Sequence, residues 1–231
     1  TESVEFSRLG LVICDEQHRF GVAQRESLLT QGEGVNMLVM SATPIPRTLA
    51  MVMFGDLDVS VIDTMPPGRK EVSTYVVDED YRARINEFMR KEIAAGHQIY
   101  VVCPAVEENA TEELPIEALE SPETAKEYIS KTSSEKKTAV EYAEHLQKNV
   151  FPNHTIGCVH GKMKGADKAR IMKSFEEGKT DILVSTTVIE VGVNIPNATM
   201  IVIENAESFG LSQLHQLRGR VGRSNKKSYC I

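Results

Sequence analysis

Seven short apolar runs recur along the chain, separated by stretches with helical spacing or by turn residues. The runs are continuous rather than alternating, which is typical of strands that a parallel sheet buries on both faces. Strand and helix in regular succession predict an α/β fold with a parallel sheet flanked by helices. The predicted strands are Leu9–Cys14, Met37–Met40, Val72–Val77, Ile99–Cys103, Thr155–Val159, Ile182–Val184 and Met200–Ile203.

Three segments between these strands carry apolar residues at the spacing of one helical face. We predict a helix in each segment. The three faces consist of Tyr81, Ile85, Phe88, Met89 and Ile93; of Ala139, Val140, Ala143, Leu146 and Val150; and of Ala169, Met172 and Phe175.

A segment with two prolines and a glycine, Thr64–Lys70, interrupts this series and predicts a linker. A complete strand–helix series follows it, whereas residues 1–65 are too short for an α/β domain of their own and resemble the back half of one. We therefore expect two domains, 1–65 and 66–231. A stretch at about 107–133, rich in glutamate, is predicted to be a surface insertion of the second domain.

The charge of the chain is unevenly distributed. Eight acids and one base lie between Glu107 and Glu127, which is −7 and equals the net charge of −7 for the whole chain. Ser212–Lys227 contains five bases and no acid. Since local charge governs local binding, the acidic total does not exclude a polyanionic partner such as DNA.

Composition excludes several classes of protein. With 41% hydrophobic and 26% charged residues, the bulk of the chain is not disordered. No apolar run approaches ~18 residues, so no membrane span is expected, and Thr1–Arg8 is polar with no apolar segment of a secretory signal after it. The four cysteines are widely spaced, which predicts reduced thiols in a cytoplasmic protein.

Two polar groups follow the first two predicted strands. The run Leu11–Cys14 is followed by Asp15 and Glu16, and ligands of open α/β sheets bind beyond the carboxyl ends of strands. Asp15 could hold Mg²⁺ through water and Glu16 could activate water, although a solvated strand end is the alternative. Ser41 and Thr43 follow the next strand, where Thr43 before a proline could equally be a helix N-cap.

Two further segments could bind phosphate. Hydroxyl residues open the segment Ser185–Pro196 after a strand, and hydroxyls and free N–H groups at such a turn hold phosphates of DNA or nucleotides. Gly219–Arg223 places two guanidinium groups among glycines, and an arginine can stabilise charge in phosphoryl transfer. A capped turn and a solvated basic turn are the respective alternatives. Gly178–Thr180 matches only the end of a phosphate-binding loop and lies in the wrong context, between a helix and a strand.

Together and in this order, the motifs resemble those of superfamily 2 helicases. Asp15–His18 resembles motif II and Ser41–Thr43 motif III, Ser185–Pro196 resembles motif V, and Gln216–Arg223 resembles motif VI. More specifically, nearly the whole chain is similar to the RecG family. The segments that carry this closer similarity are His18–Val22, Thr43–Thr48, Pro66–Lys70, Val102–Pro104 and Leu214–Arg223.

The resemblance implies two RecA-like motor domains, with residues 1–65 as the C-terminal part of the first and 66–231 as the second. It implies ATP and Mg²⁺ as cofactors, with Asp15 as the metal ligand and Glu16 as the catalytic base. The remaining roles it implies are phosphate contacts by Gln216, Arg220 and Arg223; nucleotide contacts by Gly192 and Asn194; coupling by His18, Ser41 and Thr43; and DNA contacts by His160, Gly161, Lys162, Thr186 and Thr187. Many superfamily members carry Asp at the position of Asn194.

The implied function is ATP-driven remodelling of branched double-stranded DNA, such as forks and Holliday junctions, in recombination and repair. The implied protein is a monomer of the bacterial cytoplasm, associated with the nucleoid. The family's Walker A loop would lie upstream of Thr1, so this chain alone is expected not to hydrolyse ATP. The alternatives are a transcription-repair coupling translocase of the Mfd type and a degenerate motor that serves as a binding module. Glu16, Arg220 and Arg223 argue against the latter.

Overall fold

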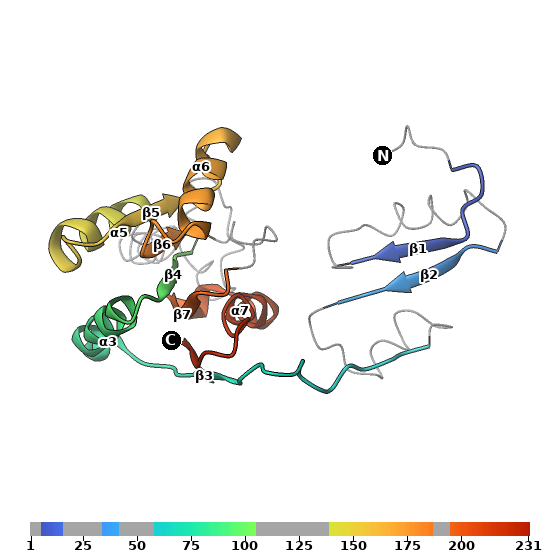
Figure 1. Cartoon of the computed structure of the whole chain (residues 1–231), viewed down its shortest axis with the longest axis horizontal. Helices are drawn as coiled ribbons and strands as arrows, with labels where there is room; N and C mark the ends of the chain where they lie inside the picture. The colour runs from blue at the N-terminus through green and yellow to red at the C-terminus, as the bar shows by residue number, and fades with distance from the viewer. Residues whose placement is uncertain (1–5, 16–33, 42–57, 105–138, 187–194) are drawn as a thin grey trace, which may run out of the picture. The chain divides into compact units, whose positions relative to one another are not determined.

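The computed structural model describes residues 6–15, 34–41, 58–104, 139–186 and 195–231 (Figure 1). It divides the chain into two compact units, Thr1–Asp63 and Thr64–Ile231. This division falls within two residues of the boundary expected from the sequence, while the assignment of the units to two motor domains stays a prediction. The predicted acidic insertion at 107–133 lies outside the described residues.

The described part of the first unit contains two parallel strands, β1 (Leu11–Cys14) and β2 (Asn36–Val39). Val12 and Cys14 of β1 are buried, but Leu11 and Ile13 are 54% and 57% exposed. The prediction of burial on both faces is therefore wrong for this strand, because β1 alternates between an inner and an outer face like a sheet covered on one side.

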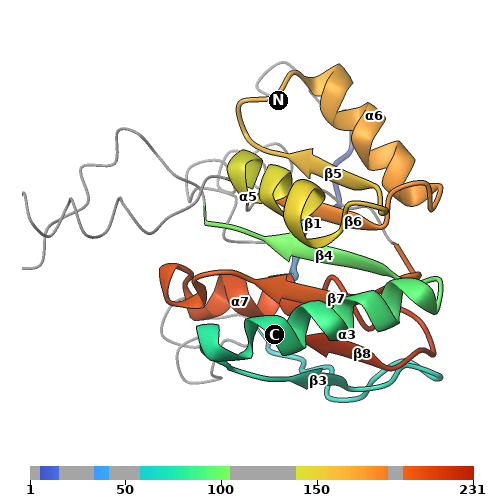
Figure 2. The same ribbon diagram turned by 90° about the vertical axis from the view of Figure 1, so that its left-hand side faces the viewer.

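The second unit is built on six parallel strands, and this confirms the predicted fold class. Figure 2 shows their order across the sheet, β3-β8-β7-β4-β6-β5. The strands are β3 (Val72–Thr74), β4 (Gln98–Val102), β5 (Ile156–Val159), β6 (Ile182–Ser185), β7 (Ala198–Ile203) and β8 (Ser228–Cys230).

Two details of this sheet differ from the sequence prediction. β3 ends at Thr74. The Tyr75 N–H still donates to the Cys230 carbonyl of β8 at 2.9 Å, but Val76, which was also predicted to continue the strand, is 96% exposed. β8 was not predicted, because its three residues form no apolar run. It becomes a strand because it lies between β3 and β7, which supply hydrogen-bond partners on both sides.

Helices cover both faces of the sheet (Figure 2). α3 (Arg82–Ala94) and α5 (Ala139–His145), extended by a π-helical turn at Leu146–Val150, pack on one face. α6 (Gly165–Glu176) and α7 (Leu211–Arg218) pack on the other. None of the helices in the described ranges is long and apolar enough to cross a membrane.

The three predicted helices are present, but three residues do not lie on the buried faces predicted for them. Tyr81 is 46% exposed, because it belongs to the 3-10 turn Glu79–Tyr81 that precedes α3. Val140 is 42% exposed, because α5 meets the sheet through Ala139, Tyr142, Ala143 and Leu146. Successive helical residues are turned by about 100°, which carries Val140 out of that face. Ala169 of α6 is exposed for the same reason. Its helix contacts the sheet through Ile171, Met172 and Phe175.

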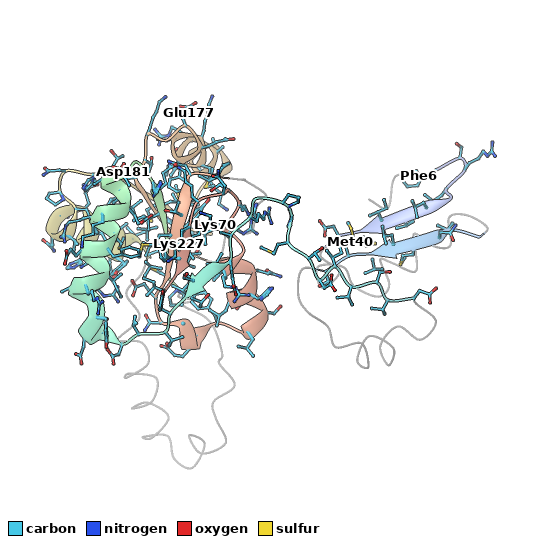
Figure 3. All side chains as sticks on the ribbon, turned by 60° about the horizontal axis from the view of Figure 1, so that its bottom comes forward. Phe6, Met40, Lys70, Glu177, Asp181 and Lys227 are labelled. Atoms are coloured by element: carbon cyan, nitrogen blue, oxygen red, sulfur yellow. The ribbon has the colours of Figure 1, made fainter. Side chains whose placement is uncertain are left out.

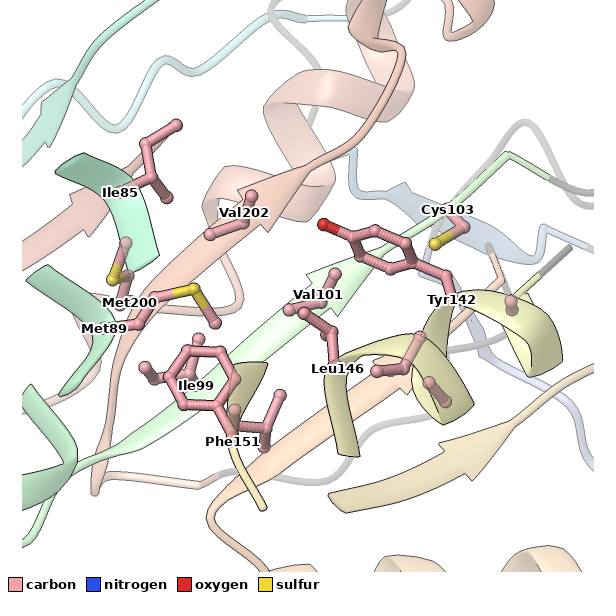
Figure 4. Close-up of a cluster of buried hydrophobic side chains, with 14 of the residues drawn as sticks. Ile85, Met89, Ile99, Val101, Cys103, Tyr142, Leu146, Phe151, Met200 and Val202 are labelled. Carbon is pink, nitrogen blue, oxygen red and sulfur yellow. The ribbon is translucent and has the colours of Figure 1, made fainter. Parts of the chain in front are cut away.

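β4 is the centre of the fold, and all five of its residues are buried. Ile99 and Val101 point toward α3 and α5, where Figure 4 shows them among the other buried side chains of that layer. Tyr100 and Val102 point to the opposite face. There the Tyr100 ring packs on the Phe175 ring of α6, with centroids 5.0 Å apart.

A buried amide joins the beginning of β4 to α6 and the turn after it. Gln98 is 4% exposed, and its Nε2 donates to the carbonyl oxygens of Phe175 at 2.6 Å and Thr180 at 2.8 Å. Both acceptors belong to residues that are themselves buried. The amide therefore satisfies two carbonyl groups that water does not reach.

Replacing Gln98 with Leu should lower the free energy of unfolding by about 2 kcal/mol, because the buried Thr180 carbonyl loses the Gln98 donor and the Phe175 carbonyl keeps only the Gly178 N–H. Urea unfolding followed by circular dichroism measures the change. Gln213→Leu is the control, since Gln213 is exposed and makes one hydrogen bond to the Gly210 N–H at the start of α7. Its loss should stay below about 1 kcal/mol. Equal losses in the two variants would contradict the role given to Gln98.

Candidate functional site

The carboxyl ends of β5 and β6 bring together four of the residues predicted to bind DNA. His160, Gly161 and Lys162 follow β5, and Thr186 follows β6. The Thr186 N–H donates to the Val159 carbonyl at 3.2 Å, so the two strand ends are direct neighbours. An ammonium group, a hydroxyl and a histidine ring at one sheet edge are groups that bind phosphate oxygens.

The second polar site is the loop from Gly219 to Lys227, which joins α7 to β8. Gln216 lies in the last turns of α7, and Arg220 and Arg223 follow in the loop. All three side chains are half-buried. The loop folds back on the helix, since Arg223 Nε donates to the Gly219 carbonyl at 2.9 Å.

The charges of this loop lie close to the hydroxyl of Tyr100 on β4. Burial raises the pKa of Tyr100 to about 12, while the positive charges of Arg220 and Arg223 oppose that rise. Burial also lowers the pKa of Arg223, and the neighbouring charge of Arg220 lowers it further. Two guanidinium groups thus lie within electrostatic reach of each other, and both are partly buried.

Gly222 lets this loop approach the start of β3. It has φ = +73°, and a Cβ placed on it would lie 2.6 Å from Val72 Cγ2 and 3.8 Å from the Lys70 carbonyl oxygen. Any side chain at this position would be strained by the backbone and would clash with β3. The glycine at position 222 of the Gln216–Arg223 motif is therefore required by the packing of the loop on β3.

The first unit places two more predicted residues at one edge. Asp15 follows β1 and Ser41 follows the end of β2, and the Met40 N–H donates to the Cys14 carbonyl at 2.8 Å. The two strand ends are therefore neighbours, with Asp15 and Ser41 exposed. Other predicted site residues lie outside the described residues: Glu16, His18, Thr43, Thr187, Gly192 and Asn194.

The sequence does not reveal a partly buried ion pair at the carboxyl end of β7. Arg82 donates to both carboxylate oxygens of Glu204, from Nη1 at 2.6 Å and from Nη2 at 2.7 Å. The Tyr142 hydroxyl donates to Glu204 Oε1 at 2.7 Å, and the Glu204 hydrogen bond raises the pKa of Arg82. Glu204 directly follows a predicted strand, as Asp15 does, and this position could have marked it as a candidate. Its pairing with Arg82 has no signal in the sequence, because the two residues are 122 positions apart.

A cavity of about 840 Å³ opens beside this ion pair, between the segment after β3 and the ends of β4 and β7. Its lining includes four acids and one arginine: Asp78, Glu79, Glu204, Glu207 and Arg82. Figure 4 shows Tyr142 and Cys103, which also line it, above the buried cluster. Because its lining is acidic, this cavity is a poor place for phosphate groups despite its size.

The family described as the helicase conserved C-terminal domain matches residues 81–225. The chain belongs to this family. The matched range includes both polar sites of the second unit, the strand ends after β5 and β6 and the arginine loop after α7.

Two curated relatives carry the same name. The chain is 51% identical over 230 residues to the ATP-dependent DNA helicase RecG of Synechocystis, and equally to that of Thermotoga maritima. It is covered completely in both matches but spans 25% and 27% of those proteins. These matches confirm the resemblance to RecG that the motifs indicated.

Solved structures agree on the fold. A structure of RecG bound to a three-way DNA junction is 46% identical, with a TM-score of 0.67, covering 99% of this chain and 26% of that one. The Mycobacterium smegmatis helicase Lhr, solved with single-stranded DNA and AMP-PNP, is 14% identical with a TM-score of 0.52. It covers 96% of this chain and 28% of that one, and it shows likeness of fold alone.

Gly222→Ala should lower the free energy of unfolding by about 3 kcal/mol, because a clash with Val72 adds to left-handed backbone strain. Gly96→Ala is the matched control: Gly96 has φ = +79° but nothing within 4 Å of the added Cβ, so only the strain of about 1 kcal/mol applies. Urea unfolding of both variants gives the difference. Equal losses would show that the loop does not pack tightly on β3.

Proposed function

We propose that the chain is part of an ATP-dependent DNA motor. This part contains the arginines that contact the nucleotide phosphates and one of the DNA-binding sites of the motor. The observation that carries this proposal is that Arg220 and Arg223 lie in the same half-buried loop after α7, within electrostatic reach of each other. The planar guanidinium group of an arginine can bind two phosphate oxygens at once, which suits this loop to a phosphate group. Membership of the helicase family and 51% identity to RecG support the same conclusion.

In this proposal, ATP is held at its phosphates by Gln216, Arg220 and Arg223, with Gly192 and Asn194 on the nucleotide side. An arginine at a transferring phosphoryl group stabilises the charge that develops there. Asp15 is an exposed carboxylate at a strand end, which fits a Mg²⁺ ion held through water. The ion would polarise the phosphoryl oxygens, and Glu16 would orient the attacking water.

The proposed DNA-binding site is the edge formed by His160, Gly161, Lys162 and Thr186, and Thr187, the next residue in the sequence, would contribute to it. Those residues follow β5 and β6, whereas the arginines precede β8. Different loops would thus serve the nucleotide and the DNA, as a motor requires. His18, Ser41 and Thr43 would transmit the nucleotide state to the DNA contacts.

The proposed substrate is branched double-stranded DNA, including forks and Holliday junctions in recombination and repair. Support comes from the likeness to RecG, which has been solved on a three-way DNA junction. We infer a monomeric protein of the bacterial cytoplasm that works at the nucleoid. Residues 1–65 would belong to the first motor domain and 66–231 to the second.

Arg220→Ala should reduce DNA-stimulated ATP turnover by about 10³-fold or more in a longer protein that contains this chain and a complete first motor domain. Steady-state phosphate release measures the rate. Arg84→Ala is the control, because Arg84 is an exposed arginine of α3 on the opposite face of the sheet from α7. It should leave the rate within about twofold. A normal rate for Arg220→Ala would remove Arg220 from the proposed role.

A further inference from the structure

The helix α6 begins at the same edge of the sheet as the proposed DNA-binding site. The loop from His160 to Lys164 joins β5 to α6, which starts at Gly165. β6 follows the helix and lies parallel to β5, so α6 runs back from the carboxyl ends of these strands to their amino ends. Figure 3 labels Glu177 and Asp181, which lie at the far end of α6, just before β6 begins.

A close contact fixes the position of α6 along β5. A Cβ on Gly157, inside β5, would lie 3.0 Å from Ile171 Cγ2 of the helix. Lys168 precedes Ile171 by three residues, which places it about 4.5 Å nearer the carboxyl edge of the sheet. Val159 is two residues after Gly157, about 6.6 Å along the strand in the same direction. Lys168 therefore lies level with the last residues of β5.

Lys168 is also on the side of α6 that faces the sheet. It precedes Ile171 by three positions and Met172 by four, and residues at these spacings share one face of a helix. Both apolar residues pack on the buried cluster of this layer, and Lys168 is itself partly buried. A lysine in such a place buries its apolar stem and keeps its ammonium group in water. Because helical side chains lean toward the start of the helix, the ammonium group extends toward the edge where β5 and β6 end.

This edge is where the backbone of the proposed DNA-binding site is held in place. The Val159 carbonyl accepts the Thr186 N–H at 3.2 Å, and the His160 carbonyl accepts the Met163 N–H at 3.2 Å. The Met163 side chain packs on the same buried cluster as α6. The loop before α6 is thus anchored to the core, and Lys168 approaches a site whose backbone is already fixed.

The charge at this end of the helix suits a polyanion. Lys162, Lys164 and Lys168 are three bases within seven residues, and Asp167 is the one acid among them. Asp167 pairs with the next turn of the helix, since its Oδ1 lies 3.3 Å from Arg170 Nη2. Positive charge therefore predominates at the start of α6, and the backbone of duplex DNA presents one negative charge per ~1.7 Å of helix axis.

We propose that Lys168 contacts the DNA backbone, so that the DNA-binding site extends from the ends of β5 and β6 onto the first turn of α6. This inference rests on the proposed function and adds to it a residue outside the loops assigned there. A lysine contact to a phosphate fixes the position of the DNA without reading its bases.

The experiment measures the affinity of the longer protein, with a complete first motor domain, for a fluorescein-labelled forked DNA duplex without nucleotide. Fluorescence anisotropy gives the affinity over a range of KCl concentrations. Lys168→Met removes the charge but keeps an unbranched apolar stem. It should weaken binding about fivefold near ~0.1 M KCl and reduce the slope of log K against log [KCl] by about 1. Lys168→Arg should restore both, since it keeps the charge.

Lys179→Met is the matched control. Lys179 is an exposed lysine in the turn after α6, at the opposite end of the sheet. The 12 residues of α6 span about 18 Å, which exceeds the Debye length of about 10 Å at ~0.1 M salt. This variant should therefore keep the salt slope and an affinity within about twofold of the unmodified protein.

A Lys168→Met protein that is folded by circular dichroism and keeps the unmodified salt slope would overturn the inference. Lys162→Met separates that failure from failure of the proposed function. If Lys162→Met lowers the slope and Lys168→Met does not, the proposed DNA-binding site stands but ends before α6. If neither variant changes the slope, the edge after β5 and β6 is not a DNA contact, and the inference fails together with the DNA-binding site on which it rests.

Discussion

The burial of β4 on both faces is the constraint on which the second unit depends. Because Gln98–Val102 is hydrogen-bonded between β6 and β7 and covered by helices on each side, no ligand reaches its middle. Polar chemistry is therefore confined to strand ends and to loops. β4 nevertheless supports the chemistry indirectly. The charges of Arg220 and Arg223 act on Tyr100, and the Gln98 side chain hydrogen-bonds to α6.

Three clusters of polar side chains lie around this core in the described part of the second unit, and we infer a different role for each from its charge. The edge after β5 and β6 is basic and hydroxylated, and the loop after α7 is rich in arginine. The third group, the pairing of Arg82 with Glu204, is internally neutralised and joins α3 to β7. We assign it to stability, because its hydrogen bonds are satisfied within the protein and its acidic surroundings repel phosphates.

The sequence was sufficient for most of the fold because buried parallel strands are continuous apolar runs. The sequence did not predict β8, because its three residues form a strand only through hydrogen bonds to the neighbouring strands β3 and β7. The motif residues were found through their resemblance to helicases. Contacts between distant segments had no local signal, and both the Arg82–Glu204 pair and the approach of Lys70 to Gly222 are of this kind.

The most direct test is a structure of the longer protein bound to forked DNA and to a transition-state analogue of ATP hydrolysis. If the proposed motor is right, guanidinium nitrogens of Arg220 and Arg223 will lie about 2.7–2.9 Å from phosphate oxygens of the nucleotide. Lys162 and Thr186 will contact the DNA backbone in the same complex. A complex in which DNA occupies the loop after α7, or in which both arginines point away from the nucleotide, would contradict the assignment of these two sites.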